Sequence, residues 1–283
     1  ISDCLVGSEM CIRDRVTPQA ANKTMGQGGF QEVEQMNLFK DMVCYQEEVR
    51  DPSRMAEVLN RVIEKAIRGS APAQINVPRD YWTQVIDIEL PQIVRFERQG
   101  GGQDAIQTAA KMLSDAKFPV ILSGAGVVIG DAINECKDLA EKLDAPVCNG
   151  YQHNDSFPGS HPLAVGPLGY NGSKAAMQLI SKADVVLALG TRLNPFSTLP
   201  GYGIDYWPKN ANIIQVDMNP DRIGLTKKVT VGIVGDAKQV AKQILQKLSS
   251  NAGDIGREDR KNLIHQTKSA WLQTLSSLDH EDD

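Results

Sequence analysis

The chain has 283 residues, a hydrophobic fraction of 41% and a formal net charge of −5, which are ordinary values for a globular protein of one large or two smaller domains. The acidic balance offers no basic surface for nucleic acid, so we expect no nucleic-acid partner. No apolar run approaches the roughly 18 residues that a membrane span needs, so we expect no membrane partner.

The first segment, residues 1–15, reads ISDCLVGSEMCIRDR and does not begin with Met. It has no secretory signal pattern. We interpret it as non-native sequence from assembly or cloning and leave it out of the predicted fold. The alternative interpretation is a divergent native segment.

Residues 52–68 have the pattern of an amphipathic helix. Apolar side chains recur at helical spacing, at Met55, Val58, Leu59, Val62, Ile63 and Ala66. Asp51 stands at the N-cap position, Pro52 stands at the first helical position, and Gly69 follows the end. The sequence therefore predicts both the helix and its two ends.

A short apolar strand is predicted at residues 73–77. Together with the preceding helix it predicts the end of an α/β domain that occupies residues 16–89. Residues 90–102 contain a proline, alternating charges and a run of glycines, which is typical of a linker. A second domain is predicted over residues 103–248.

The second domain alternates predicted helices and strands. We expect helices at 104–116, 131–143, 173–182 and 236–248, and strands at 118–122, 145–148, 184–189, 213–216 and 229–233. This alternation predicts an α/β fold with a doubly wound parallel sheet and helices on both faces. Beyond it, we expect residues 249–257 to be a flexible exit and residues 258–278 to form a helix that packs against the rest of the protein.

A glycine-rich segment, SGAGVVIG, lies between a predicted strand and a predicted helix. That context is the one in which Gly124, Gly126 and Gly130 would form a dinucleotide-binding loop. Their spacing is one residue longer than the usual fingerprint. The acidic residue that would bind a ribose about 20 residues further on is matched only loosely, by Glu141 or Asp144. Two interpretations stay open, a bound nucleotide and a turn that only allows a helix to pack closely on a strand.

Candidate metal ligands are few. Asp236 follows Gly235 but precedes Ala237, so it matches only part of a magnesium–diphosphate motif, and we predict that it is a helix N-cap. Asp217 ends a predicted strand and either meets a ribose or caps the next turn. The four histidines and five cysteines form no metal-binding spacing, so we expect no protein metal site and a protein of the reducing cytoplasm.

Two long segments carry a family resemblance. Residues 16–79 contain TPQAANKTMGQGGFQEVEQMN, and residues 150–196 read GYQHNDSFPGSHPLAVGPLGYNGSKAAMQLISKADVVLALGTRLNPF. From Val16 onward the chain resembles thiamine-diphosphate enzymes of the acetolactate-synthase type, and within that family it is most similar to the branch of acetyltransferases that act on sulfoacetaldehyde. The resemblance implies the last part of a pyrimidine-binding domain, followed by a middle domain of the DHS-like type that binds NAD or FAD in other proteins.

The resemblance also implies site residues. Phe30 and Gln31, preceded by Gly28 and Gly29, match the segment that lines the access to the reactive carbon of thiamine diphosphate. Further matches to segments that face the cofactor cleft are Tyr170, Asn171, Arg192, Asn194 and Phe196.

The second of these segments departs from acetolactate synthase. Asn194, Pro195 and Phe196 stand where that enzyme has two acidic residues and a basic one, which argues against an FAD-dependent activity. Asn171, Arg192 and Gln31 are candidate donors to a sulfonate. The alternative for each is a structural amide or a surface charge.

The implied cofactors are thiamine diphosphate and Mg²⁺, held mainly by parts outside this sequence. Neither the activating glutamate nor the diphosphate-binding motif of the family is in it, so we expect an internal fragment that is inactive alone, with residues 249–283 leading to a further domain. The implied reaction converts sulfoacetaldehyde and phosphate into acetyl phosphate and sulfite in a homodimer or tetramer.

Two alternatives remain. One is another thiamine-diphosphate enzyme, an acetolactate-synthase-like lyase or decarboxylase. The other, from a different class, is a nucleotide-binding or interaction module without catalysis.

Overall fold

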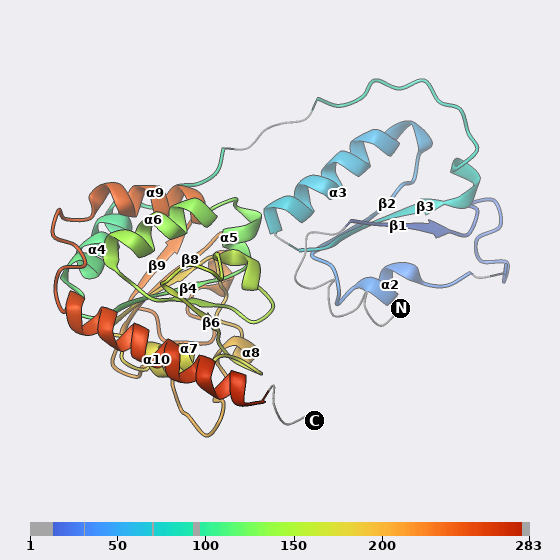
Figure 1. Ribbon diagram of the computed structural model, residues 1–283. Helices are drawn as coiled ribbons and strands as arrows, with labels where there is room; N and C mark the ends of the chain where they lie inside the picture. The colour runs from blue at the N-terminus through green and yellow to red at the C-terminus, as the bar shows by residue number, and fades with distance from the viewer. Residues whose placement is uncertain (1–13, 31, 70, 93–96, 279–283) are drawn as a thin grey trace. The chain divides into compact units, whose positions relative to one another are not determined.

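The computed structural model describes residues 14–30, 32–69, 71–92 and 97–278. The chain divides into two compact units, residues 1–96 and residues 97–283. Each unit is built on a parallel sheet with helices packed against it (Figure 1), so the predicted α/β class is confirmed. Gln31, a predicted site residue, lies outside the described residues.

The first unit contains a three-stranded parallel sheet in the order β1–β3–β2. Its strands are β1 (Asp14–Gln19), β2 (Tyr45–Glu48) and β3 (Ala73–Pro78). Its helices are α2 (Gln35–Phe39) and α3 (Met55–Gly69), with 3-10 turns η1 (Pro52–Arg54) and η2 (Arg79–Tyr81). Asp14 and Arg15, the last two residues of the segment interpreted as non-native, pair with β3 in this sheet, and the interpretation of residues 1–15 stays a prediction.

The helix predicted at residues 52–68 is confirmed, with a different first turn. Asp51 accepts a hydrogen bond from the backbone N–H of Ser53 at 2.9 Å, as an N-cap does. Pro52 then begins the 3-10 turn η1, and the α-helix starts at Met55. The buried face is narrower than predicted, because Leu59 is 36% exposed.

The sheet of the first unit has one apolar and one polar face. Alternate residues of β3 pack with α3, whereas Gln74 and Asn76 point to the opposite face and are fully buried. Asn76 donates to Glu48 at 2.8 Å and accepts from Thr17 at 3.0 Å, and Gln46 donates to Gln74 at 2.6 Å. These bonds between neighbouring strands satisfy buried polar groups that would otherwise destabilise the sheet.

The second unit is a doubly wound domain on a six-stranded parallel sheet. Its strands are β4 (Pro119–Ser123), β5 (Val147–Asn149), β6 (Ala164–Pro167), β7 (Val185–Leu189), β8 (Asn212–Asp217) and β9 (Val231–Val234). Its α-helices are α4 (Gln103–Asp115), α5 (Ala125–Ile129), α6 (Ile133–Leu143), α7 (Lys174–Ile180), α8 (Pro195–Thr198), α9 (Ala237–Lys247) and α10 (Arg257–Leu278). Two 3-10 turns complete it, η3 (Asn154–Ser156) and η4 (Pro220–Arg222).

Helices cover both faces of this sheet, as the sequence predicts. Helices α4 and α6 both pack against α9 on one face, and α7 packs against α10 on the other (Figure 1). Strands β4 and β7 are buried along their whole length. This burial explains why both read as unbroken apolar runs.

Two predicted elements of the second unit differ from the structure. The helix expected at residues 131–143 begins only at Ile133, and a separate short helix, α5, lies inside the glycine-rich segment. The segment expected to be a loop up to Pro167 ends in an additional strand, β6. That strand carries only a short apolar run next to Gly166 and Pro167, so its composition did not distinguish it from a loop.

The second unit begins earlier than the predicted boundary at residue 103. The backbone N–H of Asp236 donates to the carbonyl of Gln99 at 2.8 Å, and Gln243 donates to the carbonyl of Gly100 at 2.8 Å. Arg98 donates to the carbonyl of Gly130. Residues 97–102, predicted as the end of a linker, are therefore fastened to the second unit.

The side chain of Arg260 fixes residues 249–257, the segment predicted to be a flexible exit. Its side chain is only 1% exposed, and burial lowers its pKa. All of its donor nitrogens bind backbone carbonyls, those of Lys117, Leu143, Asp144, Gly253 and Ile255, at 2.6–2.9 Å. The exit is therefore packed, and the prediction that the following helix packs on the rest of the protein is confirmed by α10.

We expect Arg260→Ala to lower the free energy of unfolding by about 3 kcal/mol, because five buried carbonyls lose their donor. Urea unfolding followed by tryptophan fluorescence measures the change. Lys261→Ala, at an exposed neighbouring cation, is the control and should change the free energy by less than about 0.5 kcal/mol. Equal effects of the two substitutions would contradict the role given to Arg260.

Candidate functional site

The carboxyl ends of the strands in the second unit form the candidate site. Along the sheet the order is β6–β5–β4–β7–β8–β9, so the direction in which the chain progresses reverses between β4 and β7. In open parallel sheets, ligands bind outside the carboxyl ends of the strands near such a reversal. We call this region the carboxyl edge.

At the carboxyl edge, the turn after β4 touches the turn after β7. The N–H of Gly126 donates to the carbonyl of Gly190 at 2.8 Å. A Cβ atom on Gly126 would lie 2.7 Å from the Cα of Gly190, and one on Gly124 would lie 2.6 Å from the Cβ of Thr191. Both glycines are therefore required by the close approach of two backbones.

The third glycine of this segment also has a packing reason. A Cβ atom on Gly130 would lie 2.7 Å from the carbonyl oxygen of Gly126. The geometry thus accounts for Gly124, Gly126 and Gly130 without a ligand, which favours the packing interpretation of the motif. Nucleotide binding by these residues stays a prediction.

Three aromatic side chains meet at the carboxyl edge, and we call them the aromatic cluster: Tyr151, Tyr170 and Phe196. The ring centroids lie 6.5 Å apart for Tyr151 and Tyr170, 5.7 Å for Tyr151 and Phe196, and 6.2 Å for Tyr170 and Phe196. Such tilted and edge-on contacts are favourable for aromatic rings. The cluster therefore joins three loops that are far apart in the sequence.

Tyr170 and Phe196 present apolar surface to solvent, with exposed fractions of 56% and 51%. Their backbones are joined by a hydrogen bond from Tyr170 N to Phe196 O of 3.1 Å. The backbone N–H of Tyr151 donates a hydrogen bond to Ser197 Oγ at 3.0 Å, which fixes the backbone of Tyr151. The structure thus brings two predicted cleft residues together and adds Tyr151, which the sequence analysis missed although it lies just beyond the end of β5.

The polar residues of the predicted cleft have different roles. Asn194 accepts from the N–H of Phe196 at 2.9 Å and is the N-cap of α8. Asn171 is exposed and has a left-handed backbone, with φ of 53°. Arg192 is half-buried. Asn194 therefore has a structural role, while Asn171 and Arg192 stay candidate anion donors.

The other predicted cleft residues lie in the first unit. Gly28, Gly29 and Phe30 form an exposed loop after β1, and the Phe30 side chain is 87% exposed. The carboxylate of Glu32 binds the backbone of this loop, accepting from the N–H of Gly26 and from that of Gly29. The loop is thus anchored by a charged group.

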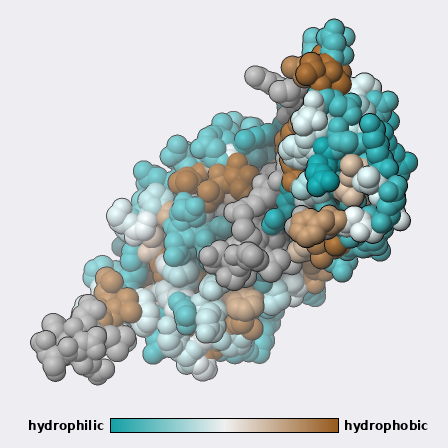
Figure 2. Space-filling view, turned by 90° about the vertical axis from the view of Figure 1, so that its right-hand side faces the viewer, coloured by the Kyte–Doolittle hydropathy of each residue, from teal (hydrophilic) through white to brown (hydrophobic). Residues whose placement is uncertain are grey.

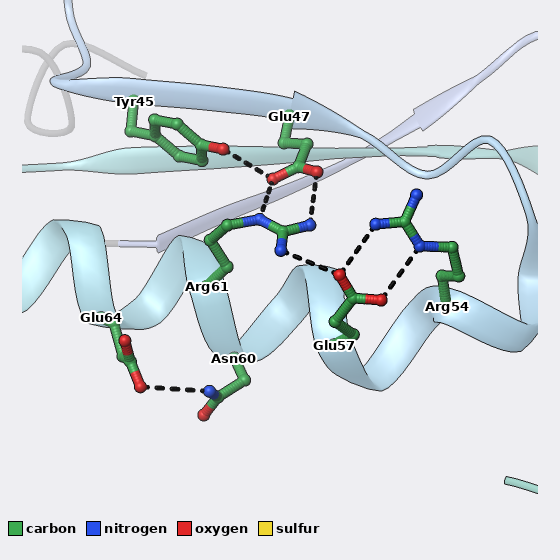
Figure 3. Close-up of polar contacts among 7 residues, drawn as sticks. All are labelled: Tyr45, Glu47, Arg54, Glu57, Asn60, Arg61 and Glu64. Atoms are coloured by element: carbon green, nitrogen blue, oxygen red, sulfur yellow. Dashed lines mark hydrogen bonds and ion pairs between the residues drawn. The ribbon is translucent and has the colours of Figure 1, made fainter. Parts of the chain in front are cut away.

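The first unit also has a cavity of about 530 Å³, lined by Gln19, Met25, Glu34, Met36, Gln46, Glu47, Glu48, Arg50, Arg54 and Val58. Beside it runs a chain of ion pairs (Figure 3), in which Arg61 bridges Glu47 and Glu57 at 2.8 and 2.9 Å. Hydrogen bonds from Arg54 and Arg61 lower the pKa of Glu57 to about 2. These arginine and glutamate side chains pair with one another, so their charges do not indicate a bound ligand.

Other candidate groups are occupied by structural roles. Asp236 accepts from the N–H groups of Lys238 and Gln239, so the predicted N-cap is confirmed. Asp217 accepts from the N–H of Asn219 at 2.8 Å, and burial raises its pKa. Burial also raises the pKa of the Cys136 thiol to about 12, which excludes a thiolate near neutral pH.

Within the described residues, no group of three or more His, Cys, Asp or Glu side chains is arranged to hold a metal ion. Among the helices in this part of the chain, none combines the length and the apolar character that crossing a membrane requires.

Comparison with known families gives the class of protein. Residues 106–244 match the family described as "Thiamine pyrophosphate enzyme, central domain", which agrees with the doubly wound second unit. The second unit is therefore similar to the central domain of thiamine pyrophosphate enzymes.

The relatives narrow the class. Over 268 residues the chain is 80% identical to the probable sulfoacetaldehyde acetyltransferase of Rhizobium meliloti (strain 1021), an alignment that covers 95% of this chain and 45% of that protein. It is 78% identical to the sulfoacetaldehyde acetyltransferase of Roseovarius nubinhibens, with 95% and 44% covered. The probable acetolactate synthase large subunit of Methanocaldococcus jannaschii is 34% identical, with 93% and 43% covered. The chain thus spans just under half the length of these relatives.

We expect Gly126→Ala to lower the free energy of unfolding by about 2 kcal/mol, because the new methyl group meets backbone rather than a movable side chain. Thermal or urea unfolding measures the loss. Gly102→Ala is the matched control, since a Cβ there meets nothing within 4 Å. If Gly126→Ala were as stable as Gly102→Ala, the two turns would not be in contact.

Proposed function

We propose that the whole protein is a thiamine-diphosphate-dependent sulfoacetaldehyde acetyltransferase, which converts sulfoacetaldehyde and phosphate into acetyl phosphate and sulfite. The observation that carries the proposal is the difference in identity between the relatives, 80% to a probable sulfoacetaldehyde acetyltransferase against 34% to a probable acetolactate synthase. The departure at Asn194, Pro195 and Phe196 supports the same choice and a reaction without FAD.

The aromatic cluster fits a contribution to such a site. Thiamine diphosphate, when bound, supplies the nucleophilic carbon that attacks the aldehyde. The exposed rings of Tyr170 and Phe196 would present apolar surface at the carboxyl edge and exclude water. Water exclusion matters for this reaction because phosphate, and not water, must accept the acetyl group.

Anion binding would fall to Arg192 and Asn171. Both substrates are anions, and a guanidinium binds sulfonate or phosphate oxygens with paired, charge-assisted hydrogen bonds. Asn194 does not join them in this proposal, because its side-chain oxygen caps α8.

The described residues do not fit a site for Mg²⁺, since none of their acidic, His or Cys side chains form a suitable group of three. We therefore assign the metal and the diphosphate group to residues outside those described. A cytoplasmic homodimer or tetramer completes the proposal, in keeping with the position between two subunits that the resemblance implies for the cofactor.

We expect the whole protein, purified with thiamine diphosphate and Mg²⁺, to release sulfite and acetyl phosphate in equal amounts from sulfoacetaldehyde and phosphate. Quantifying both products in one reaction tests this directly. Turnover of pyruvate or another 2-oxo acid, with none of sulfoacetaldehyde, would keep the cofactor and reject the substrate. Absence of turnover with every such substrate would favour a module without catalysis.

A further inference from the structure

The loop that carries Phe30 is held by one carboxylate. Glu32 accepts from the N–H of Gly26 with one carboxylate oxygen and from the N–H of Gly29, at 3.0 Å, with the other. These bonds hold the pKa of Glu32 below its ordinary value. Charge-assisted bonds of this kind are stronger than bonds between neutral groups.

The glycines serve the backbone conformation of the loop. Gly26 and Gly28 have left-handed φ angles of 83° and 72°, and a Cβ atom on either would meet nothing within 4 Å. Space therefore does not require glycine at these positions. Successive turns of this kind direct backbone N–H groups to one side, where they bind an anion, and here that anion is the carboxylate of Glu32.

Packing does not hold Phe30 in place. Its side chain is 87% exposed. Apolar side chains form several separate patches on the face drawn in Figure 2, so exposure alone does not identify a functional residue. What distinguishes Phe30 is that it lies between Gly29 and Glu32, the two ends of one of these hydrogen bonds.

We propose that Glu32 is a positioning residue of the reaction, which sets the place of Phe30 by binding the N–H groups of Gly26 and Gly29. This inference rests on the proposed function and on the role that the family resemblance implies for Phe30, which is to line the access to the reacting carbon. Glu32 itself touches neither substrate nor cofactor in this proposal. Its effect passes through the backbone of residues 26–30.

The test compares Glu32→Ala and Glu32→Gln in the whole protein. Misplacing a group beside the reacting atoms by about 1 Å costs roughly a hundredfold in rate, so we expect Glu32→Ala to lower kcat by about 10- to 100-fold. The KM for phosphate should change by less than about threefold, because the proposed function assigns anion binding to Arg192 and Asn171. Glu32→Gln keeps one acceptor oxygen and should lose less activity than Glu32→Ala.

Asp41→Ala is the matched control, because Asp41 is an exposed acidic residue outside the cavity lining. It should leave kcat unchanged. An equal loss for Asp41→Ala and Glu32→Ala would overturn the specific role of Glu32.

Hydrogen exchange of the Gly26 and Gly29 amides provides a readout that is independent of activity. We expect both amides to be protected in the parent protein and to exchange faster in Glu32→Ala. Unchanged protection overturns the anchoring of the loop. Faster exchange with unchanged kcat overturns the positioning role alone. A parent protein without sulfoacetaldehyde turnover refutes the proposed function, and with it the positioning role, while the exchange rates still report whether Glu32 holds the loop.

Discussion

The contact between the backbones of Gly126 and Gly190 is the constraint on which the carboxyl edge depends. It joins the turn after β4 to the turn after β7 at the point where the order of the strands reverses. The segment that leaves β7 from this contact carries Arg192 and then Phe196. The contact leaves no room for a side chain at the point where the strand order reverses. It therefore also fixes the start of the segment on which these candidate cleft residues lie.

Charged side chains bound to backbone groups fasten two further segments of the chain. Arg260 holds the segment before α10 through carbonyl oxygens, and Glu32 holds the glycine loop of the first unit through N–H groups. Both use the strength of charge-assisted hydrogen bonds to backbone groups. A loop held in this way can present an exposed side chain such as Phe30 without burying it.

The sequence predicts elements whose signals are local. The helix after Asp51, the N-cap Asp236 and the alternation of the second unit are set by short-range periodicity and capping, and the structure has them. Contacts between distant segments were not predictable in the same way. Nothing near Arg260 in the sequence indicates that some of its partners come from the end of α6 and from the turn before β4. Tyr151 joins the aromatic cluster because the loops that follow β5 and β7 meet at the carboxyl edge.

The central claim is that the aromatic cluster of the carboxyl edge is what the second unit contributes to the catalytic cleft. A structure of the whole protein with thiamine diphosphate bound, determined by crystallography or electron cryo-microscopy, tests it most directly. The account predicts that the rings of Tyr170 and Phe196 line the same cavity as the reactive carbon of the cofactor. Rings that face bulk solvent, or a subunit contact remote from the cofactor, would contradict it.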